Sequence, residues 1–277
     1  MSEAGSRELE GAVHEVLSIA RAAGSLVMQG YRTRPRTSEK TPKDIVTEFD
    51  LRSEELITEA LARSFPGVRV VGEETSVDEA QPTDRGMVFY VDPIDGTTNF
   101  AHGHPVFAVS IGFFVDGVPG GGAIVAPALS IEWHGVNSPR SAALYRNGER
   151  ATVSDTTDLR EGLIATGFPP ERDVAPANNF DSFMHVKRNA RAVRRCGAAA
   201  IDIAFVADGT YDGYWERRLH VWDAAAAAAF VLAAGGRITA LDGSTPNYER
   251  GHIVVSNGRI HEELLRCLAA SQRPRPA

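Results

Sequence analysis

The densest group of side chains able to do chemistry is the run Asp92-Pro93-Ile94-Asp95-Gly96-Thr97-Thr98-Asn99-Phe100. Two carboxylates three residues apart stand at a turn rich in Pro and Gly, and two hydroxyls and an amide follow at once. The apolar run 87–91 before them predicts a buried strand. Carboxylate oxygens are the ligands that Mg²⁺ prefers, and the N–H groups of Gly96 and Thr97 can hold a phosphate where a helix begins. The pattern favours metal-assisted phosphate chemistry.

The same residue types also occur in three other kinds of structure. Asp-Pro and Asp-Gly pairs are equally compatible with an ordinary turn that binds nothing. A helix–loop–helix calcium site needs oxygen ligands at alternate positions, whereas the spacing here is three. A phosphatase that forms an aspartyl-phosphate needs one exposed Asp with its own acid–base partner, and nothing in the run singles out one Asp.

Two further acidic residues stand at the ends of predicted elements. Glu73 closes a predicted strand at 68–71, and Asp223 precedes an alanine-rich run that predicts a helix up to the stop at Gly235-Gly236. We interpret Asp223 first as the N-cap of that helix. A carboxylate that caps a helix keeps lone pairs with which it can also bind a metal.

Hydrophobic periodicity predicts the elements that must position these groups. Helices are expected at 9–27, 54–65, 178–188, 198–207, 224–234 and 260–268, with a loop at 31–43. Strands are expected at 68–71, 87–91, 106–115, 121–125, 130–133, 142–145, 163–166, 192–193, 211–215, 237–239 and 253–255. Closely spaced turns in the first half predict antiparallel hairpins, and the later alternation of strands and helices predicts a second sheet flanked by helices.

This organisation suggests two subdomains that share a site. We expect an N-terminal α+β subdomain at 1–150, a C-terminal α/β subdomain at 151–270 and a disordered tail at 271–277. The length of 277 residues allows a substantial core.

Composition limits the classes of function. The net charge of −7 argues against a nucleic-acid surface, but a bound cation would still allow an anionic substrate. Cys196 and Cys267 do not make a disulfide framework. No signal segment or membrane span is evident, so we expect a cytoplasmic protein without a membrane partner.

Three segments together resemble the signatures of the inositol monophosphatase family. They are Gly72-Glu73-Glu74, the run 92–100, and Trp222-Asp223 followed by a small-residue helix and Gly235-Gly236. The segment Asp44–Asp50 is similar to the part of the family that precedes the first signature. The resemblance implies an α/β (α+β) fold, a layered αβαβα sandwich with an antiparallel N-terminal sheet, a mixed C-terminal sheet and the site between the two halves.

The resemblance also implies roles for individual residues. Glu73, Asp92, Asp95, Asp223 and the carbonyl of Ile94 are expected to hold two or three Mg²⁺ ions. Thr97 is expected to orient the attacking water, and Asp50 and Glu73 to accept its proton. Substrate contacts are expected from Asp95, Gly96, Thr97, Ala199, Glu216, His220 and Asp223.

The predicted activity is Mg²⁺-dependent hydrolysis of a phosphomonoester, with myo-inositol 1-phosphate as the favoured substrate. Histidinol phosphate or another sugar or polyol phosphate is the enzymatic alternative, and a regulatory partner in transcription or ribosome assembly is the non-catalytic one. We further expect inhibition by Li⁺ and a homodimer.

Overall fold

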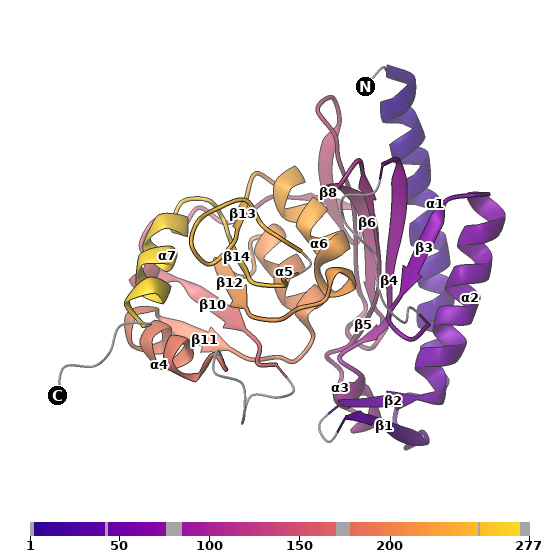
Figure 1. Ribbon diagram of the computed structural model, residues 1–277, viewed down its shortest axis with the longest axis horizontal. Coiled ribbons are helices and arrows are strands. Elements are labelled where there is room, and N and C mark those ends of the chain that lie inside the picture. The colour runs from indigo at the N-terminus through magenta and orange to yellow at the C-terminus, as the bar shows by residue number, and fades with distance from the viewer. Residues whose placement is uncertain (1–2, 42–43, 76–84, 170–177, 249, 272–277) are drawn as a thin grey trace.

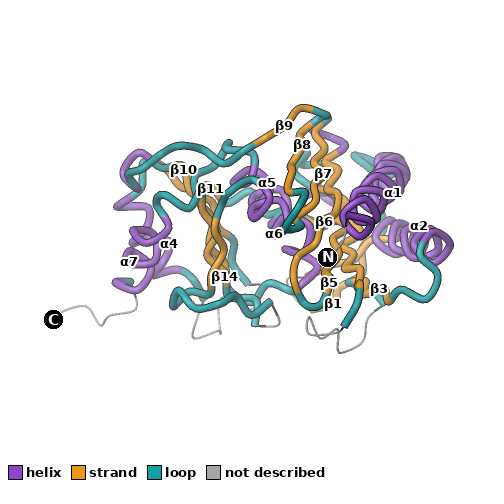
Figure 2. Tube along the Cα trace, turned by 90° about the horizontal axis from the view of Figure 1, so that it is seen from above, coloured by secondary structure: helices purple, strands orange, loops and turns teal. Residues whose placement is uncertain are grey.

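A computed structural model of the chain describes residues 3–41, 44–75, 85–169, 178–248 and 250–271. Within these residues the helices and sheets form five layers in the order α, β, α, β, α, most easily seen from above (Figure 2). One outer layer consists of α1 and α2, the other of α4 and α7, and α5 and α6 lie between the two sheets (Figure 1). The predicted layered sandwich is therefore confirmed.

The first half of the chain builds one large sheet and the helices that cover its outer face. Its strands follow the order β3-β4-β5-β6-β7-β8-β9, and all neighbours are antiparallel except β3 and β4. The helices are α1 (Glu3–Met28), α2 (Glu48–Ser64) and α3 (Thr97–Ala101). The strands are β1 (Thr37–Thr41), β2 (Asp44–Thr47), β3 (Arg69–Gly72), β4 (Met87–Asp95), β5 (Ala108–Val115), β6 (Val118–Ala126), β7 (Ile131–Asn137), β8 (Ala142–Arg146) and β9 (Glu149–Ala151).

The second half builds a mixed sheet in the order β11-β10-β12-β14-β13. Strand β10 runs parallel to both of its neighbours, and β14 runs antiparallel to both of its neighbours. Its helices are α4 (Phe180–Asn189), α5 (Ala199–Ala207), α6 (Val221–Ala233) and α7 (His261–Ala270). Its strands are β10 (Leu163–Thr166), β11 (Ala192–Arg194), β12 (Gly213–Glu216), β13 (Arg237–Thr239) and β14 (Ile253–Ser256). None of the helices in the described ranges is long and apolar enough to cross a membrane.

Three local predictions were wrong. The expected loop 31–43 contains β1, which pairs with β2. The second helix begins at Glu48 rather than Glu54, because the Thr47 hydroxyl and the Asp50 carboxylate form a capping box there. Ser271, assigned to the tail, caps α7, and the rest of that tail lies outside the described residues.

The alanine run of α6 has a packing function. A Cβ atom added to Gly112 on β5 would lie 2.3 Å from the backbone nitrogen of Ala226 and 2.6 Å from the carbonyl carbon of Ala225. Helix and sheet therefore meet backbone to backbone, which only small side chains permit. This close approach fixes α6, and with it Asp223, against the first sheet.

We predict that Gly112→Ala lowers the free energy of unfolding by about 1–3 kcal/mol, because the added methyl group overpacks this contact. Urea denaturation measures the change. Gly11→Ala is the matched control, since Gly11 lies on α1 with nothing within 4 Å of an added Cβ, and it should be neutral or slightly stabilising. Equal stability of Gly112→Ala and the wild type would show that α6 and β5 are not in close contact.

Candidate active site

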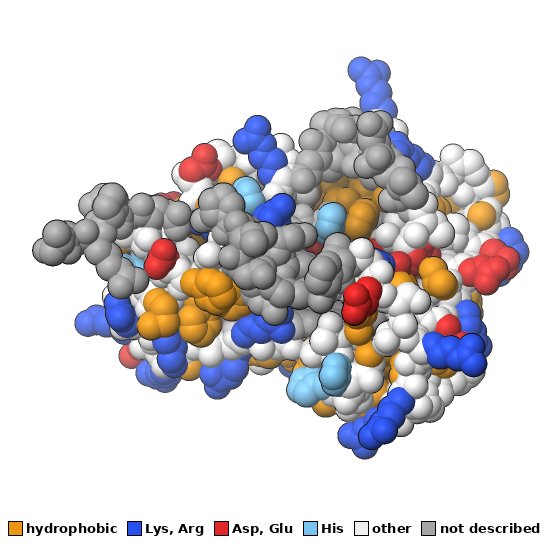
Figure 3. Space-filling model, turned by 60° about the horizontal axis from the view of Figure 1, so that its bottom comes forward, with side chains coloured by type: hydrophobic (Ala, Val, Ile, Leu, Met, Phe, Trp, Pro, Cys, Tyr) orange, Lys and Arg blue, Asp and Glu red, His pale blue; other side chains and the backbone are white. Residues whose placement is uncertain are grey.

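Side chains from both halves of the chain face one cavity of about 300 Å³. The view that brings the bottom of the molecule forward shows acidic side chains recessed near the middle of that face (Figure 3). The cavity is lined by Asp44, Glu73, Asp92, Ile94, Asp95, Gly96, Thr97, Thr98, Asn99, Arg195, Gly197 and Asp223. The structure thus brings together the four carboxylates that the sequence singled out.

Glu73 stands directly after β3 and forms a salt bridge with a lysine side chain. Lys40 Nζ lies 2.9 Å from Glu73 Oε1 and 2.6 Å from Glu74 Oε1. Burial alone would lower the pKa of Lys40, but the charges of the two glutamates outweigh it and raise that pKa. The lysine thereby neutralises part of the acidic cluster.

Asp92 lies near the end of β4 and is 2% exposed. Its Oδ1 accepts a hydrogen bond from the Ile94 N–H at 3.1 Å, so the irregular end of β4, where the pairing with β5 shifts register, holds the carboxylate in place. Burial, and then the charge of Glu73, raise the pKa of Asp92 well above its ordinary value. A positive charge beside Asp92 would therefore favour its ionised form.

Asp95 connects the two halves of the chain. Its two oxygens accept hydrogen bonds from the N–H groups of Ala199 at 3.0 Å and Ala200 at 2.8 Å. These donors are in the first turn of α5, whose N-cap residue Ala198 has no side-chain acceptor, so Asp95 supplies the cap. Burial raises the pKa of Asp95 to about 7 in spite of these bonds.

Asp223 is not an N-cap, contrary to the sequence-based interpretation. The N-cap of α6 is His220, and Asp223 is the third helical residue, which accepts the His220 N–H at 2.7 Å. It therefore closes the capping box from inside the first turn. Burial and the charge of Glu73 raise the pKa of Asp223 well above its ordinary value.

Thr97 and Asp50 lie in contact beside the cavity. The Thr97 hydroxyl oxygen is 3.0 Å from both Asp50 Oδ1 and the Ile94 carbonyl oxygen, and its single proton is donated to one of them at a time. Asp50 Oδ2 also accepts the Thr47 N–H at 2.8 Å. Burial raises the pKa of Asp50 to about 6.

Several residues that were predicted to contact the substrate do not line the cavity. Glu216 is buried and accepts a hydrogen bond from the Tyr214 hydroxyl, and burial raises its pKa to about 7. His220 is exposed and stacks on Trp222 with ring centroids 4.7 Å apart. Neither residue lines the cavity, and the N–H of Ala199 is already bonded to Asp95.

The donor set suits a hard cation. The four carboxylates offer oxygen ligands alone, which is what Mg²⁺ requires. Burial raises the pKa values of Asp92, Asp95 and Asp223, so a cation beside them would favour their ionised form. Within the described ranges, no three acidic, histidine or cysteine side chains already converge as a preformed cage. Lys40 bonds to Oε1 of Glu73, so this ion pair would either share the carboxylate with a metal or give way to it.

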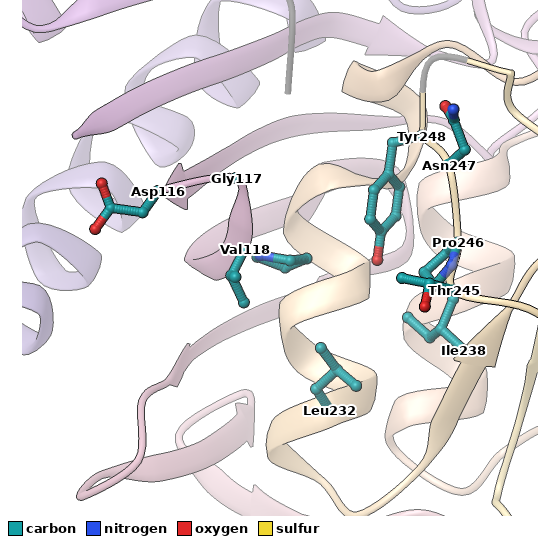
Figure 4. Close-up of a pocket in the computed structure, with 10 residues that line it drawn as sticks. Asp116, Gly117, Val118, Leu232, Ile238, Thr245, Pro246, Asn247 and Tyr248 are labelled. Atoms are coloured by element: carbon teal, nitrogen blue, oxygen red, sulfur yellow. The ribbon is translucent and has the colours of Figure 1, made fainter. Parts of the chain in front are cut away.

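A larger and more apolar cavity, of about 690 Å³, lies elsewhere (Figure 4). It lies against α6 at Leu232 and against the β5–β6 turn, which starts at Asp116. The carboxylates stand at the other end of β5, where Ala108 pairs with Asp95, so roughly 25 Å of strand separates the two places. Size alone would have pointed to this cavity rather than to the one that the carboxylates line.

Four residues near the site escaped the sequence analysis. Arg195 lines the cavity, Lys40 pairs with Glu73, and Ser53 and Glu54 of α2 bond to the turns that carry the acidic residues. The spacing of Asp50, Ser53 and Glu54 puts them on one helix face. That signal was lost because the helix was predicted to begin only at Glu54.

We predict that the metal-free protein loses stability as the pH rises from about 4 to about 7. A carboxyl group whose pKa is higher in the folded state, as for Asp95 (3.8 to about 7), favours the folded state below that pKa and this advantage disappears above it. Added Mg²⁺ should therefore raise the melting temperature more at about pH 8 than at about pH 5. Thermal melts with and without Mg²⁺ test this, with Asp92→Asn as the variant whose pH dependence should be flatter. An equal rise in melting temperature on adding Mg²⁺ at both pH values would contradict the electrostatic account.

The comparisons with known proteins agree with this arrangement. The sequence profile of the inositol monophosphatase family matches residues 12–273. An inositol-1-monophosphatase of Synechocystis is 38% identical over 228 residues, which cover 82% of this chain and 78% of the relative. The Nus factor SuhB of Pseudomonas aeruginosa is 37% identical over 255 residues, which cover 90% of this chain and 92% of the relative.

A solved structure shares the fold as well. The inositol monophosphatase from Anabaena superposes with a TM-score of 0.85 at 35% identity and covers 95% of this chain and 97% of its own. With the sequence profile, the relatives and the fold in agreement, the chain belongs to the inositol monophosphatase family, a family of generally metal-dependent phosphatases.

Proposed function

We propose that this phosphatase hydrolyses myo-inositol 1-phosphate to myo-inositol and phosphate in a Mg²⁺-dependent reaction, with two or three ions per site. The observation that carries the proposal is the cluster of Glu73, Asp92, Asp95 and Asp223 around one cavity. A cavity of about 300 Å³ that is lined mainly by polar groups fits a small phosphorylated polyol. The name of the Synechocystis relative favours the inositol ester.

The four carboxylates and the Ile94 carbonyl would hold the ions. Bound Mg²⁺ would supply charge neutralisation at the phosphoryl and leaving oxygens and acidify water. Thr97 would orient the attacking water, because its oxygen can accept a hydrogen bond while its proton goes to Asp50. Asp50 and Glu73 are the proposed acceptors of the proton from that water, and the N–H groups of Gly96 and Thr97 would hold the phosphate.

The second half of the chain would recognise the alcohol. Glu216 is held rigidly by burial and by Tyr214. The negative charge of Asp95 adds to the effect of burial in raising the pKa of Glu216, so this carboxyl group lies within electrostatic reach of the cluster. We propose that Glu216, Ala199 and His220 contact the hydroxyl groups of the substrate. Inhibition by Li⁺, a homodimer and a cytoplasmic location remain predictions.

A regulatory role is the second candidate, and the similarity to the Nus factor SuhB of Pseudomonas aeruginosa favours it. A regulatory partner has no need for four carboxylates around a cavity, and their mutual repulsion costs stability. Hydrolysis is therefore the primary proposal. The candidates are distinguished by measuring phosphate release by the purified protein and comparing kcat/KM for inositol 1-phosphate, histidinol phosphate and glycerol 2-phosphate. If none of the three gives Mg²⁺-dependent release, hydrolysis is refuted.

We predict that Asp92→Asn and Asp223→Asn each lower kcat at least ~100-fold while the fold is retained, because a carboxamide binds a hard cation more weakly and metal catalysis supplies several kcal/mol. Phosphate release at saturating Mg²⁺ and circular dichroism are the measurements. Asp155→Asn changes an exposed residue away from the cavity and should behave as the wild type. Normal turnover by either site variant would remove that residue from the proposed ligand set.

We also predict different kinetic effects from the two halves. Glu216→Gln should raise KM for inositol 1-phosphate, or change the preference between it and glycerol 2-phosphate, more than it lowers kcat. Thr97→Ala should lower kcat with little change in KM, since orienting the water matters mainly in the transition state. If Glu216→Gln impairs both substrates equally and through kcat alone, Glu216 supports catalysis and the proposed position of the alcohol is incorrect.

A further inference from the structure

The helix α2 presents three polar side chains, Asp50, Ser53 and Glu54, to the start of α3, the end of β4 and the turn after β3. All three are buried, although polar groups on an inward helix face are costly unless they are hydrogen-bonded. Asp50 accepts from Thr97 at 3.0 Å, and Ser53 Oγ donates to the Pro93 carbonyl at 3.2 Å. Each of these bonds reaches a segment that carries proposed site residues.

Glu54 makes the corresponding contact with the turn after β3. The residue is 1% exposed. Its Oε2 accepts the Glu74 N–H at 2.8 Å, and its Oε1 accepts the Thr75 hydroxyl at 2.5 Å. Both oxygens of the carboxylate are therefore used as acceptors, whereas a carboxamide has a single acceptor oxygen.

Gly72 shows how tightly this contact is built. A Cβ atom added to Gly72 would lie 2.3 Å from the carboxyl carbon of Glu54, so any larger residue would push the carboxylate away from the turn. Glu73 lies between Gly72, which packs on Glu54, and Glu74, which bonds to it. The Glu73 N–H also donates to the Val91 carbonyl of β4 at 3.1 Å. The backbone of Glu73 is therefore fixed on both sides, while its side chain is left to line the cavity.

We propose that Glu54 is a positioning residue that sets the metal affinity of the site by fixing the backbone on either side of Glu73. The inference rests on the proposed role of Glu73 as a metal ligand. Residues that orient metal ligands without touching the metal typically contribute about 10- to 100-fold in affinity. Glu54 would act in this way through the main chain.

The test is Glu54→Met, which nearly keeps the size of the side chain and removes both acceptor oxygens. A Gln would be a weaker test, because its NH2 group could donate to the Thr75 hydroxyl and so restore the second contact. Isothermal titration of the metal-free protein with Mg²⁺ should show a dissociation constant about 10- to 100-fold higher than that of the wild type. In phosphate-release assays the Mg²⁺ concentration for half-maximal rate should rise in parallel, while KM at saturating Mg²⁺ changes little. Glu55→Met, at the exposed neighbouring position of α2, is the matched control and should leave all three quantities unchanged.

A folded Glu54→Met variant with wild-type Mg²⁺ affinity would overturn the proposal. If that variant fails to fold, Thr75→Val decides, because it removes one of the two bonds and leaves Glu54 intact: weaker Mg²⁺ binding supports the proposal, and unchanged binding overturns it. The titration needs no substrate. A wild-type protein that binds Mg²⁺ but releases no phosphate would therefore refute the proposed function and leave this inference standing.

Discussion

The burial of Asp92, Asp95 and Asp223 close to Glu73 is the constraint around which the site is built. Burial and neighbouring charge raise the pKa values of Asp92, Asp95 and Asp223, so the cluster is at a disadvantage near neutral pH unless a cation joins it. Lys40 supplies one positive charge, at Glu73. Divalent cations would supply further positive charge, which links the stability of the fold to the proposed chemistry.

Holding such a cluster together takes rigid support from elements far apart in the sequence. The capping box at the start of α6 fixes Asp223, and α6 is pressed on β5 where Gly112 leaves room for the helix backbone. Asp95 caps α5, so the same carboxylate belongs to the first sheet and stabilises a helix of the second half. The polar face of α2 supports the remaining turns.

The sequence was sufficient where the controlling interactions are local. The strand and turn chemistry around Asp92 and Asp95, and the repeated strand and helix periodicities, predicted the elements, and the resemblance predicted how the layers assemble. It was insufficient where a role depends on a distant partner. Nothing near Lys40 indicates that it pairs with Glu73, 33 residues away. The bond from Asp95 to α5 spans 104 residues, and the position of Asp223 inside the helix depends on His220, which is not a usual N-cap residue.

The central claim is that these four carboxylates form a divalent-cation site. Diffraction from crystals soaked in Mn²⁺, which substitutes for Mg²⁺ at oxygen ligands, tests it most directly through the anomalous signal of the metal. The account predicts peaks between Glu73, Asp92, Asp95 and Asp223. Crystals of active protein with no anomalous peak among these side chains would contradict it.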